Sequence, residues 1–478
     1  MLVALAGGYG YHRDELYFLR AGQELAFGYV DQPPLTPLFA RISTELFGNS
    51  LVGLRLWAAL AAGLVVLLTG LLAREFGSRR DAQALAAGAM AASTFLLGAG
   101  HVHSTATFDL LAWTALTFLL ARALRVGRWT WLAAGVVAGI GLENKSLVLA
   151  LLAAFGVGLV LVGPRSVLRG RWVWLGLLVT LLIWAPHLAW QAGHGWPVLR
   201  FAAAIADGGG GYALSRVFFL PYQLLVANPL LVPIWAAGLW RLLRPDPPVR
   251  TYRVFAIAYL LLVLTFLIVC GKPYYLAGMY PMLFAAGAEP ALHWVHAAPT
   301  RPRVRRRGGV LAGVLTFALA SSVVLMLPVI PVRELSRTAI AGNPNVAESI
   351  GWPEFAGTIS RAYADLPAGE RVHAIVLTGN YGEAGAVDRY RRELRLPPAY
   401  SGHNSYADWG PPPESSGTVI AIGIPEPRLR RWFGSVRQAG RIDNGVGVAN
   451  KEQNRPVYVC RGRLAPWGRI WPRVRHIG

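Results

Sequence analysis

Residues 51–73 read LVGLRLWAALAAGLVVLLTGLLA, a run of mostly apolar side chains that is long enough to cross a membrane as one helix. A spanning helix needs roughly 20 such residues, because each adds about 1.5 Å and the hydrocarbon core is about 30 Å thick. Nine further apolar runs follow, at 82–100, 106–121, 129–142, 146–163, 172–190, 219–240, 252–270, 274–296 and 308–332. Runs 106–121 and 129–142 are short for a span, so we expect them to be tilted or re-entrant. The sequence predicts a mainly α-helical, polytopic transmembrane bundle.

The composition agrees with a membrane protein and excludes several other classes. Apolar residues make up 54% of the 478 residues and charged residues only 15%, which is unusual for a soluble globular protein. The net charge of +21 would indicate nucleic-acid binding if the cations shared one face of a soluble domain, but they are spread over the loops between apolar runs. Two cysteines, Cys270 and Cys460, supply neither a disulfide framework nor zinc-ligand spacing.

The loops between the runs alternate sharply in positive charge. One set of loops, at 74–80, 122–128, 165–171, 241–253 and 301–307, carries 18 arginines. The opposite loops, at 101–105, 143–145, 191–218 and 271–273, carry only Lys145, Arg200, Arg216 and Lys272. The positive-inside rule places the arginine-rich loops in the cytoplasm. It predicts a multi-pass protein of the inner or plasma membrane, with residues 1–50, the sparse loops and the chain after 332 on the outer side.

Three regions follow from this organisation. Residues 1–50 are expected to form an outer first loop with interfacial helices, 51–332 the membrane domain, and 333–478 a small extracytoplasmic α/β domain. In that last domain the patterns predict helices at 353–365, 383–395 and 427–438, and strands at 373–377, 418–424 and 456–460. The glycine run 208–211 is expected to act as a hinge in its outer loop.

The N-terminal stretch 1–10 is apolar but too short to span. It also lacks the basic region and cleavage site of a signal peptide. We expect it to be the outer end of a first transmembrane helix that begins upstream of this start.

The first outer loop, YHRDELYFLRAGQELAFGYVDQPPLTP at 11–37, contains the adjacent carboxylates Asp14 and Glu15. A solvated acidic pair on an interfacial helix is the ordinary interpretation. Carboxylates are rare in this chain, however, and at lipid depth an ionisable group costs about 2.5–3.5 kcal/mol or more. We therefore take both as candidate catalytic residues and the neighbouring Arg13 as a candidate phosphate ligand.

The other sparse loops add further candidate site residues. Asp109 lies at the start of a helix, where it either caps that helix or has a functional role. His101 and His103 form a His-x-His pair that is one option for a divalent metal, but without a regular ligand spacing we predict no metal and no other cofactor.

The two lysines of the sparse loops each have two interpretations. Lys145 either pairs with Glu143 or binds an anion, and the sequence leaves both open. Lys272, followed by Tyr275 in GKPYYLAGMYP, either extends to the interface as lysines at helix ends do or binds a lipid phosphate.

Six motifs occur in order along the chain: the early Asp-Glu, VDQPPL, FDLLAW, GLENKS, WAPHLAWQ and GKPYYLAGMYP. Together they resemble the C-type glycosyltransferase superfamily, above all the bacterial branch of glycosyltransferase family 39, which is related to protein O-mannosyltransferases and the lipid A aminoarabinose transferase. The likeness covers 11–296 and extends into the tail through NYGEAGAVDRY and LPPAYSGHNSYADWGPP. Each motif alone is weak, and their order is the specific signal.

The resemblance implies an inverting transferase that moves a sugar from a polyprenyl-phosphate carrier to an acceptor on the outer face. On the matching positions, Asp14 is the catalytic carboxylate with Glu15 its companion, Lys272 the lysine near the donor phosphate, and Lys145 the basic position of the hairpin. Two features depart from the family pattern: the absent first helix, and Glu143 where many relatives have an apolar residue.

Two other classes of protein compete with this interpretation. A multi-span transporter or flippase would use buried ionisable residues, but we find no symmetry between two halves of the chain. A structural or assembly factor would leave the outer-side charges without a purpose. The expected partners are a polyprenyl-phosphate-linked sugar and membrane lipid, with no nucleic acid. The sugar and the acceptor, whether protein, lipid or glycan, cannot be deduced from the sequence.

Overall fold

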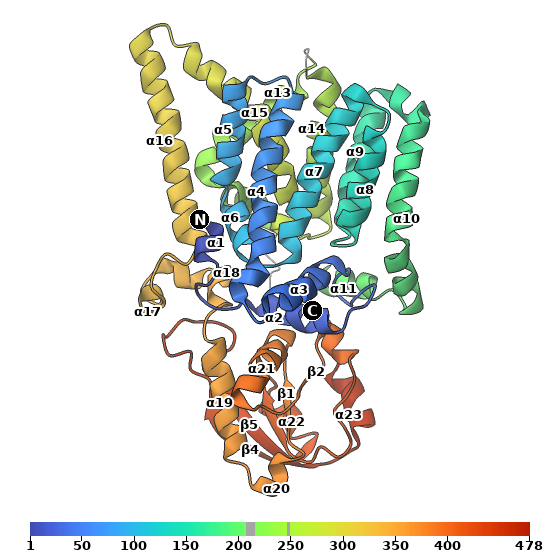
Figure 1. Cartoon of the computed structure of the whole chain (residues 1–478), viewed down its shortest axis with the longest axis vertical. Helices are drawn as coiled ribbons and strands as arrows, with labels where there is room; N and C mark the ends of the chain where they lie inside the picture. Colours follow the sequence, from blue (N-terminus) through green and yellow to red (C-terminus); the bar gives the residue numbers. More distant parts are fainter. Residues whose placement is uncertain (207–215, 246–248) are drawn as a thin grey trace.

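The computed structural model describes residues 1–206, 216–245 and 249–478; the glycine run 208–211, expected to be a hinge, lies outside them. A bundle of long helices forms one part of the molecule, and a small α/β domain lies beyond one end of it (Figure 1). The protein is a multi-pass membrane protein with the helical fold expected from its apolar runs.

All ten apolar runs form helices, but they differ in length and continuity. Five are long and apolar enough to span: α4 (Leu51–Glu75), α7 (Thr105–Val126), α10 (Arg171–Gly193), η3 with α14 (Arg250–Tyr252 and Arg253–Ile268) and α16 (Arg301–Met326). Two are broken pairs, α5 (Arg80–Ala91) with α6 (Thr94–His101), bent by 60°, and α12 (Arg216–Ala227) with η2 (Pro229–Leu231) and α13 (Val232–Leu243), bent by 83°. The rest are the shorter α8 (Thr130–Leu142), α9 (Val148–Val162) and α15 (Tyr280–His296).

Several spans differ from the sequence prediction. Run 106–121 is not short, since α7 continues to Val126, whereas 146–163 gives a helix of only 15 residues. Run 219–240 is interrupted at Asn228, which has a positive φ of 80° and precedes a proline. A proline disfavours helical backbone at the residue before it. Run 274–296 starts as the 3₁₀ helix η4 (Pro273–Met279), where Gly278 packs so closely on Trp113 that a Cβ would lie 2.6 Å from it.

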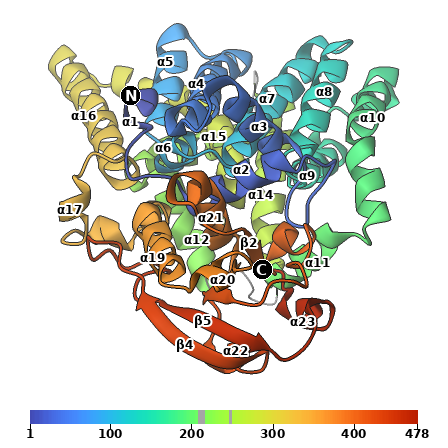
Figure 2. The ribbon, with the colours of Figure 1, turned by 60° about the horizontal axis from the view of Figure 1, so that its bottom comes forward.

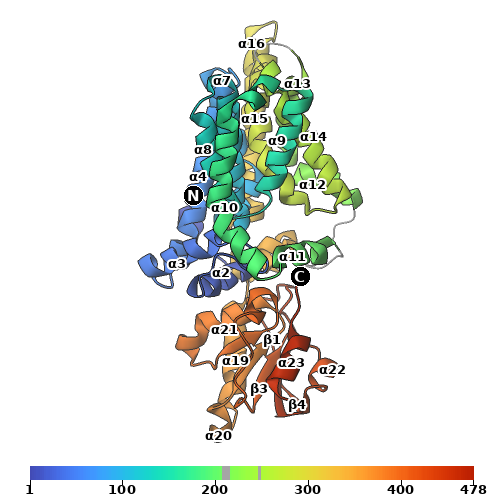
Figure 3. The same ribbon diagram turned by 90° about the vertical axis from the view of Figure 1, so that its right-hand side faces the viewer.

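The first fifty residues lie across one end of the bundle. They form α1 (Leu2–Leu5), α2 (Arg13–Gln23) and α3 (Leu35–Phe47), and α11 (Pro197–Ala206) lies at the same end (Figures 1 and 3). The arginine-rich loops α4–α5, α7–α8, α9–α10 and α15–α16 lie at the opposite end (Figure 1). The arginine-rich loops, which alternate with sparse loops along the sequence, are therefore gathered at one end of the bundle, away from the first fifty residues.

The C-terminal domain is built on a five-stranded mixed sheet in the order β2-β1-β3-β5-β4. Its strands are β1 (Ile375–Thr378), β2 (Ala399–Ser401), β3 (Val419–Ile422), β4 (Phe433–Arg441) and β5 (Pro456–Arg463). β1 runs parallel to β2 and β3, and β5 runs antiparallel to β3 and β4. Figure 2 shows the domain from the end of the molecule.

Helices cover both faces of this sheet. One face packs on α19 (Trp352–Ala364) and α21 (Tyr381–Leu394), and this core continues into α2 through Leu16 and Tyr17. The other face packs on α23 (Trp467–Val474). The remaining short elements are η1 (Arg165–Arg169), α17 (Val332–Leu335), η5 (Ala339–Gly342), α18 (Pro344–Ala347), α20 (Ala368–Arg371), η6 (Asn404–Ala407) and α22 (Glu426–Leu429).

The predicted helix at 427–438 is wrong. Only the single turn α22 is helical there, and the chain then enters β4. Phe433 and Val436 are buried while their neighbours are exposed, and β4 pairs along its length with β5. Pairing with a strand distant in sequence overrides the local helical pattern. The helices predicted at 353–365 and 383–395 and the three predicted strands are confirmed within a few residues.

Candidate active site

The start of α2 determines how the two adjacent carboxylates point. His12 is the N-cap, and its Nδ1 accepts a hydrogen bond of 3.2 Å from the Asp14 backbone N–H. The Glu15 carboxylate reaches back to the His12 backbone N–H at 2.7 Å, which completes a capping box. Consecutive side chains on a helix do not face the same way, so Glu15 turns into the protein while Asp14 stays at its surface.

Glu15 is fully buried, and both of its oxygens are occupied. Arg55 of α4 donates to Oε1 and Oε2 at 2.8 Å each, and the backbone N–H of His103 donates to Oε1 at 2.9 Å. Arg55 also donates to the carbonyls of Ala6 and Gly10 at 2.8 Å. The pair thus joins the N-terminal segment, α2 and α4 at one point, which suits an anchor better than a reactive group.

Asp14 is accessible and ionised. Its side chain is 36% exposed, and Oδ1 accepts a hydrogen bond of 2.9 Å from the hydroxyl of Tyr381 in the C-terminal domain. Burial raises the pKa of this carboxyl, but the charges of His12 and Arg13, the Tyr381 hydrogen bond and the charge of Lys272 outweigh it, so the pKa lies below its usual value. Asp14 is therefore a proton acceptor at physiological pH.

The Nζ atom of Lys145 is buried and has no hydrogen-bond acceptor among the described residues. Lys145 lies in the hairpin between α8 and α9. The rings of Tyr274 and Tyr275 each lie 5.0 Å from Nζ. Asp109 of α7 is close enough for its charge to interact with that of Lys145, and its own Oδ1 also has no partner among the described residues. A desolvated ammonium without an acceptor indicates a binding site for an anion.

Lys272 contributes a second positive charge to the same place. It is the N-cap of η4, half-buried, and its charge interacts with those of Lys145, Asp14 and Asp31. A small hollow lies beside them, lined by Phe95, Ala106, Asp109, Leu110, Tyr274, Ala277 and Gly278. The structure thus brings together Asp14, Asp109, Lys145, Lys272 and Tyr275, which the sequence places in four separate loops.

The remaining predicted residues have other contacts. His101 Nε2 lies 3.1 Å from Arg55 Nη1, and the ring of His103 bonds the carbonyl of Thr36 at 3.0 Å. Within the part of the chain that the structure describes, no three His, Cys, Asp or Glu side chains form a metal site. Whether the protein needs a metal stays a prediction.

Arg13 turns toward the C-terminal domain. It is buried, its Nη1 lies 3.4 Å from Glu348, and its guanidinium lies 4.7 Å from the centre of the Tyr381 ring. These contacts place it behind Asp14, between α2 and the tail. Its predicted role as a phosphate ligand is untested.

Sequence reasoning missed Arg55 and Tyr381, and it did not predict the contact that Asn404 makes with Asp31. Arg55 is a lone cation inside the apolar run 51–73, and that anomaly was the available signal. Asn404 Nδ2 donates to Asp31 Oδ2 at 2.9 Å, and Tyr381 contacts Asp14. Both come from tail motifs more than 350 residues from their partners, so no local pattern indicates these contacts.

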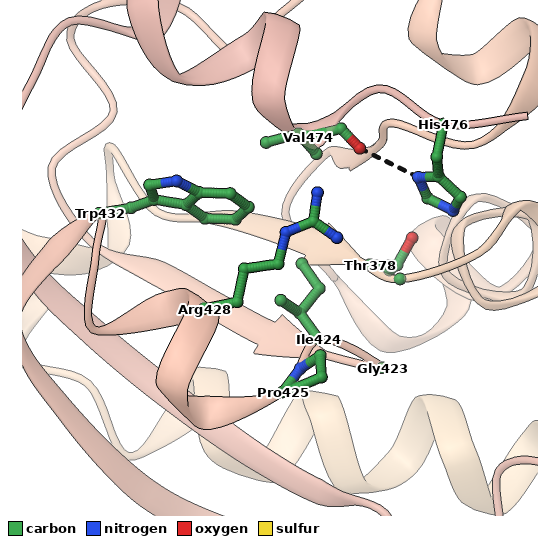
Figure 4. A pocket seen from close by; sticks show the side chains of 9 residues that line it. Thr378, Gly423, Ile424, Pro425, Arg428, Trp432, Val474 and His476 are labelled. Atoms are coloured by element: carbon green, nitrogen blue, oxygen red, sulfur yellow. Dashed lines mark hydrogen bonds between the residues drawn. The ribbon is translucent and has the colours of Figure 1, made fainter.

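A separate pocket lies in the C-terminal domain, at the ends of β1 and β3 (Figure 4). Arg428 extends into it beside Trp432, with Thr378 and His476 on its other side (Figure 4). The polar groups that line it already have partners in the domain. Thr378 donates to the carbonyl of Asn380 at 3.1 Å, His476 Nδ1 bonds that of Val474 at 3.0 Å, and Arg428 donates to that of Arg473.

Comparison with known proteins finds a family model and solved structures that are similar to this chain. The family model for dolichyl-phosphate-mannose-protein mannosyltransferase matches residues 31–190. The crystal structure of ArnT from Cupriavidus metallidurans in the apo state matches with a TM-score of 0.59 and 15% identity, covering 96% of this chain and 95% of that one. The chain therefore shares the overall fold of that structure. The fold-level resemblance expected from the ordered motifs is confirmed.

Two further solved structures share this fold. ArnT bound to undecaprenyl phosphate matches with a TM-score of 0.57 and 16% identity over 96% of each chain. The oligosaccharyltransferase AglB from Archaeoglobus fulgidus, in complex with an inhibitory peptide and a dolichol-phosphate, matches with a TM-score of 0.52 and 12% identity, covering 87% of this chain and 66% of that one. No protein with a curated function matches this chain.

Proposed function

We propose that this C-type protein is an inverting glycosyltransferase that moves a sugar from a polyprenyl-phosphate carrier to an acceptor at the outer face of the membrane. The observation that carries the proposal is the presence, at the same end of the bundle, of an ionised and accessible carboxylate, Asp14, and of the Lys145 ammonium, which is buried and has no hydrogen-bond acceptor in the described part of the chain. A base for a hydroxyl and a cation for a phosphate are what this transfer needs. The similar structures with bound undecaprenyl phosphate and dolichol-phosphate support a lipid-linked donor.

The reaction follows from these two charges and needs no covalent enzyme intermediate. The acceptor hydroxyl oxygen attacks the anomeric carbon of the donor sugar, and its proton passes to an oxygen of Asp14. The bond between that carbon and the phosphate oxygen breaks, and the electron pair leaves with the polyprenyl phosphate. Lys145 and Lys272 stabilise the charge that develops on the phosphate. One displacement of this kind inverts the anomeric centre.

Glu15 enters this scheme as a positioning residue. Its capping contact with His12 fixes the first turn of α2, and its bond to Arg55 fixes α2 against α4. Both contacts determine where the neighbouring Asp14 lies. A transporter or flippase remains the alternative, but such sites lie typically near the bilayer midplane. Asp14 lies instead in the first turn of α2, and Lys145 and Lys272 lie in loops, all at one end of the bundle.

The first prediction tests the orientation, because the chemistry needs these loops on the outer side. In a chain whose Cys270 and Cys460 are replaced by serine and alanine, Ser435→Cys should react with a membrane-impermeant reagent in intact cells. Ser166→Cys should react only after lysis. Both positions are exposed, so accessibility within the fold is matched. The reverse labelling pattern would place the candidate site on the cytoplasmic side and contradict the proposal.

The second prediction tests Lys145 with undecaprenyl phosphate as the probe. Lys145→Met keeps the length of the side chain but removes the charge, so binding of the probe should weaken about tenfold or more, the effect of one lost charge-assisted hydrogen bond. The matched control is Lys451→Met, because the Lys451 ammonium already has Glu348 at 3.0 Å. Native mass spectrometry of the protein in lipid measures both. Equal binding by the two variants would remove Lys145 from the phosphate site.

A further inference from the structure

We propose that Tyr381, in the C-terminal domain, is a positioning residue for Asp14, so that this domain forms part of the active site. This inference rests on the proposed function. Tyr381 is the first residue of α21, directly after β1 and its turn. Its hydroxyl donates to Asp14 Oδ1 at 2.9 Å. A hydrogen bond from the C-terminal domain therefore determines the direction of one carboxylate oxygen, and the other oxygen is left to face the acceptor.

The backbone that carries Tyr381 is fixed by a capping box of its own. The Asn380 side chain accepts a hydrogen bond of 3.0 Å from the Glu383 N–H. Glu383, fully buried, accepts from the N–H groups of Gly379 and Asn380 at 2.9 and 3.1 Å. The start of α21 is thus rigid, although Tyr381 is 367 residues from Asp14.

Three neighbours hold the Tyr381 ring in place. Tyr17 of α2 stacks on it with centroids 4.7 Å apart, and His403 stacks on it at the same distance. The Arg13 guanidinium lies 4.7 Å from the ring centre. His403 stacks in turn on His476. Stacked rings bury large areas and prefer defined geometries, so the hydroxyl has little freedom to leave Asp14.

A second contact of the same kind lies beside the first. Asn404 donates to Asp31 Oδ2 at 2.9 Å, Tyr17 donates to Asp31 Oδ1 at 2.7 Å, and Ser405 accepts from the Val30 backbone N–H at 3.0 Å. Asp14 and Asp31, two carboxylates of the first loop, therefore each take a hydrogen bond from the C-terminal domain. This repeated contact shows that the domain is docked on the loop by specific polar bonds as well as by apolar packing.

The hydrogen bond also affects the charge state of Asp14. The groups that face Asp14 are His12 and Arg13 on its own helix, Asp31 in its loop, Lys272 and Tyr274 at η4, and Tyr381. Burial, and then the charge of Asp14, raise the pKa of Tyr381 well above its usual value. The phenol therefore stays protonated and donates to Asp14 at every physiological pH.

The test is Tyr381→Phe, which keeps the ring and removes only the donor. The substrate is the polyprenyl-phosphate sugar that accumulates in cells lacking the gene. Transfer should fall about tenfold, and the acid limb of the kcat/KM profile should move up by about one pH unit, because Asp14 loses a bond that favours its ionised form. The acid limb moves to higher pH because a general base is active only when it is deprotonated, that is, above its pKa.

The matched control is Tyr406→Phe, which removes a buried tyrosine hydrogen bond of 2.9 Å to Asp388 in the same domain. That variant should keep the wild-type acid limb, and both variants should bind undecaprenyl phosphate normally, which shows that the fold is intact. An unchanged acid limb in Tyr381→Phe, or an equal shift in Tyr406→Phe, would contradict the positioning role. If Asp14→Asn itself transfers normally, the base assigned in the proposed function fails instead, so the two failures are distinguishable.

Discussion

Asp14→Asn should lower sugar transfer by about 100-fold or more while binding of undecaprenyl phosphate stays close to that of the wild type. Asparagine has nearly the same shape and still accepts the Tyr381 hydrogen bond, but it cannot take the proton of the acceptor hydroxyl. Removal of a general base costs typically 10²–10⁴-fold. The loss should appear in kcat and not in donor affinity, because Asp14 acts on the acceptor side of the reaction.

The matched control for this experiment is Glu45→Gln. Glu45 is a carboxylate of the same outer loop that is 59% exposed and pairs only with its helix neighbour Arg41. Its neutralisation should leave transfer unchanged. Near-normal transfer by Asp14→Asn would remove Asp14 from the mechanism and make Asp109 the next candidate. A normal rate of transfer after loss of either carboxylate would remove both Asp14 and Asp109 from the mechanism.

Glu15→Ala should destabilise the protein by about 3–5 kcal/mol, the usual effect of removing one partner from a buried ion pair. It leaves the Arg55 guanidinium, which is 1% exposed, without its carboxylate. The backbone N–H groups of His12 and His103 lose their acceptor as well. The measurement is thermal unfolding of the purified protein in lipid, where a loss of this size lowers the midpoint by many degrees.

Two further variants separate the anchor role of Glu15 from general sensitivity of α2. Glu24→Ala, on the same helix, breaks an exposed pair with Arg20 and should change stability by less than about 1 kcal/mol. The double variant Glu15→Leu with Arg55→Met removes both charges and should recover part of the loss. A Glu15→Ala protein with wild-type stability and no activity would instead assign the chemistry to Glu15.

The membrane fold was largely predictable because long apolar runs and arginine-rich loops act locally. The same holds for α19 and α21, whose start signals lie within a few residues of the helix. β4 was not predictable in this way. Its residues have no strong alternation, and the strand exists because β5, which begins 15 residues after β4 ends, pairs with it.

The candidate site was partly predictable for a related reason. Asp14, Lys145 and Lys272 are rare charges in sparse loops, so the sequence marks each one. The sequence could not predict which of the two adjacent carboxylates is exposed, because an Asp-Glu pair alone does not determine whether Asp14 or Glu15 points into the protein. That choice depends on the capping box of His12 and on Arg55. The contacts of Tyr381 and Asn404 with the first loop depend on how the C-terminal domain packs on that loop, and no local sequence pattern indicates this packing.

The measurement that tests the central claim most directly is mass spectrometry of lipid-linked sugars and envelope glycans in cells lacking the gene, complemented with wild type or with Asp14→Asn. We expect one polyprenyl-phosphate sugar to accumulate and one envelope component to lose that sugar. The wild-type gene should reverse both changes, and Asp14→Asn, present at equal level in the membrane, should reverse neither. An unchanged lipid-linked sugar pool with unchanged envelope glycans, or full complementation by Asp14→Asn, would contradict a glycosyltransferase that uses this carboxylate.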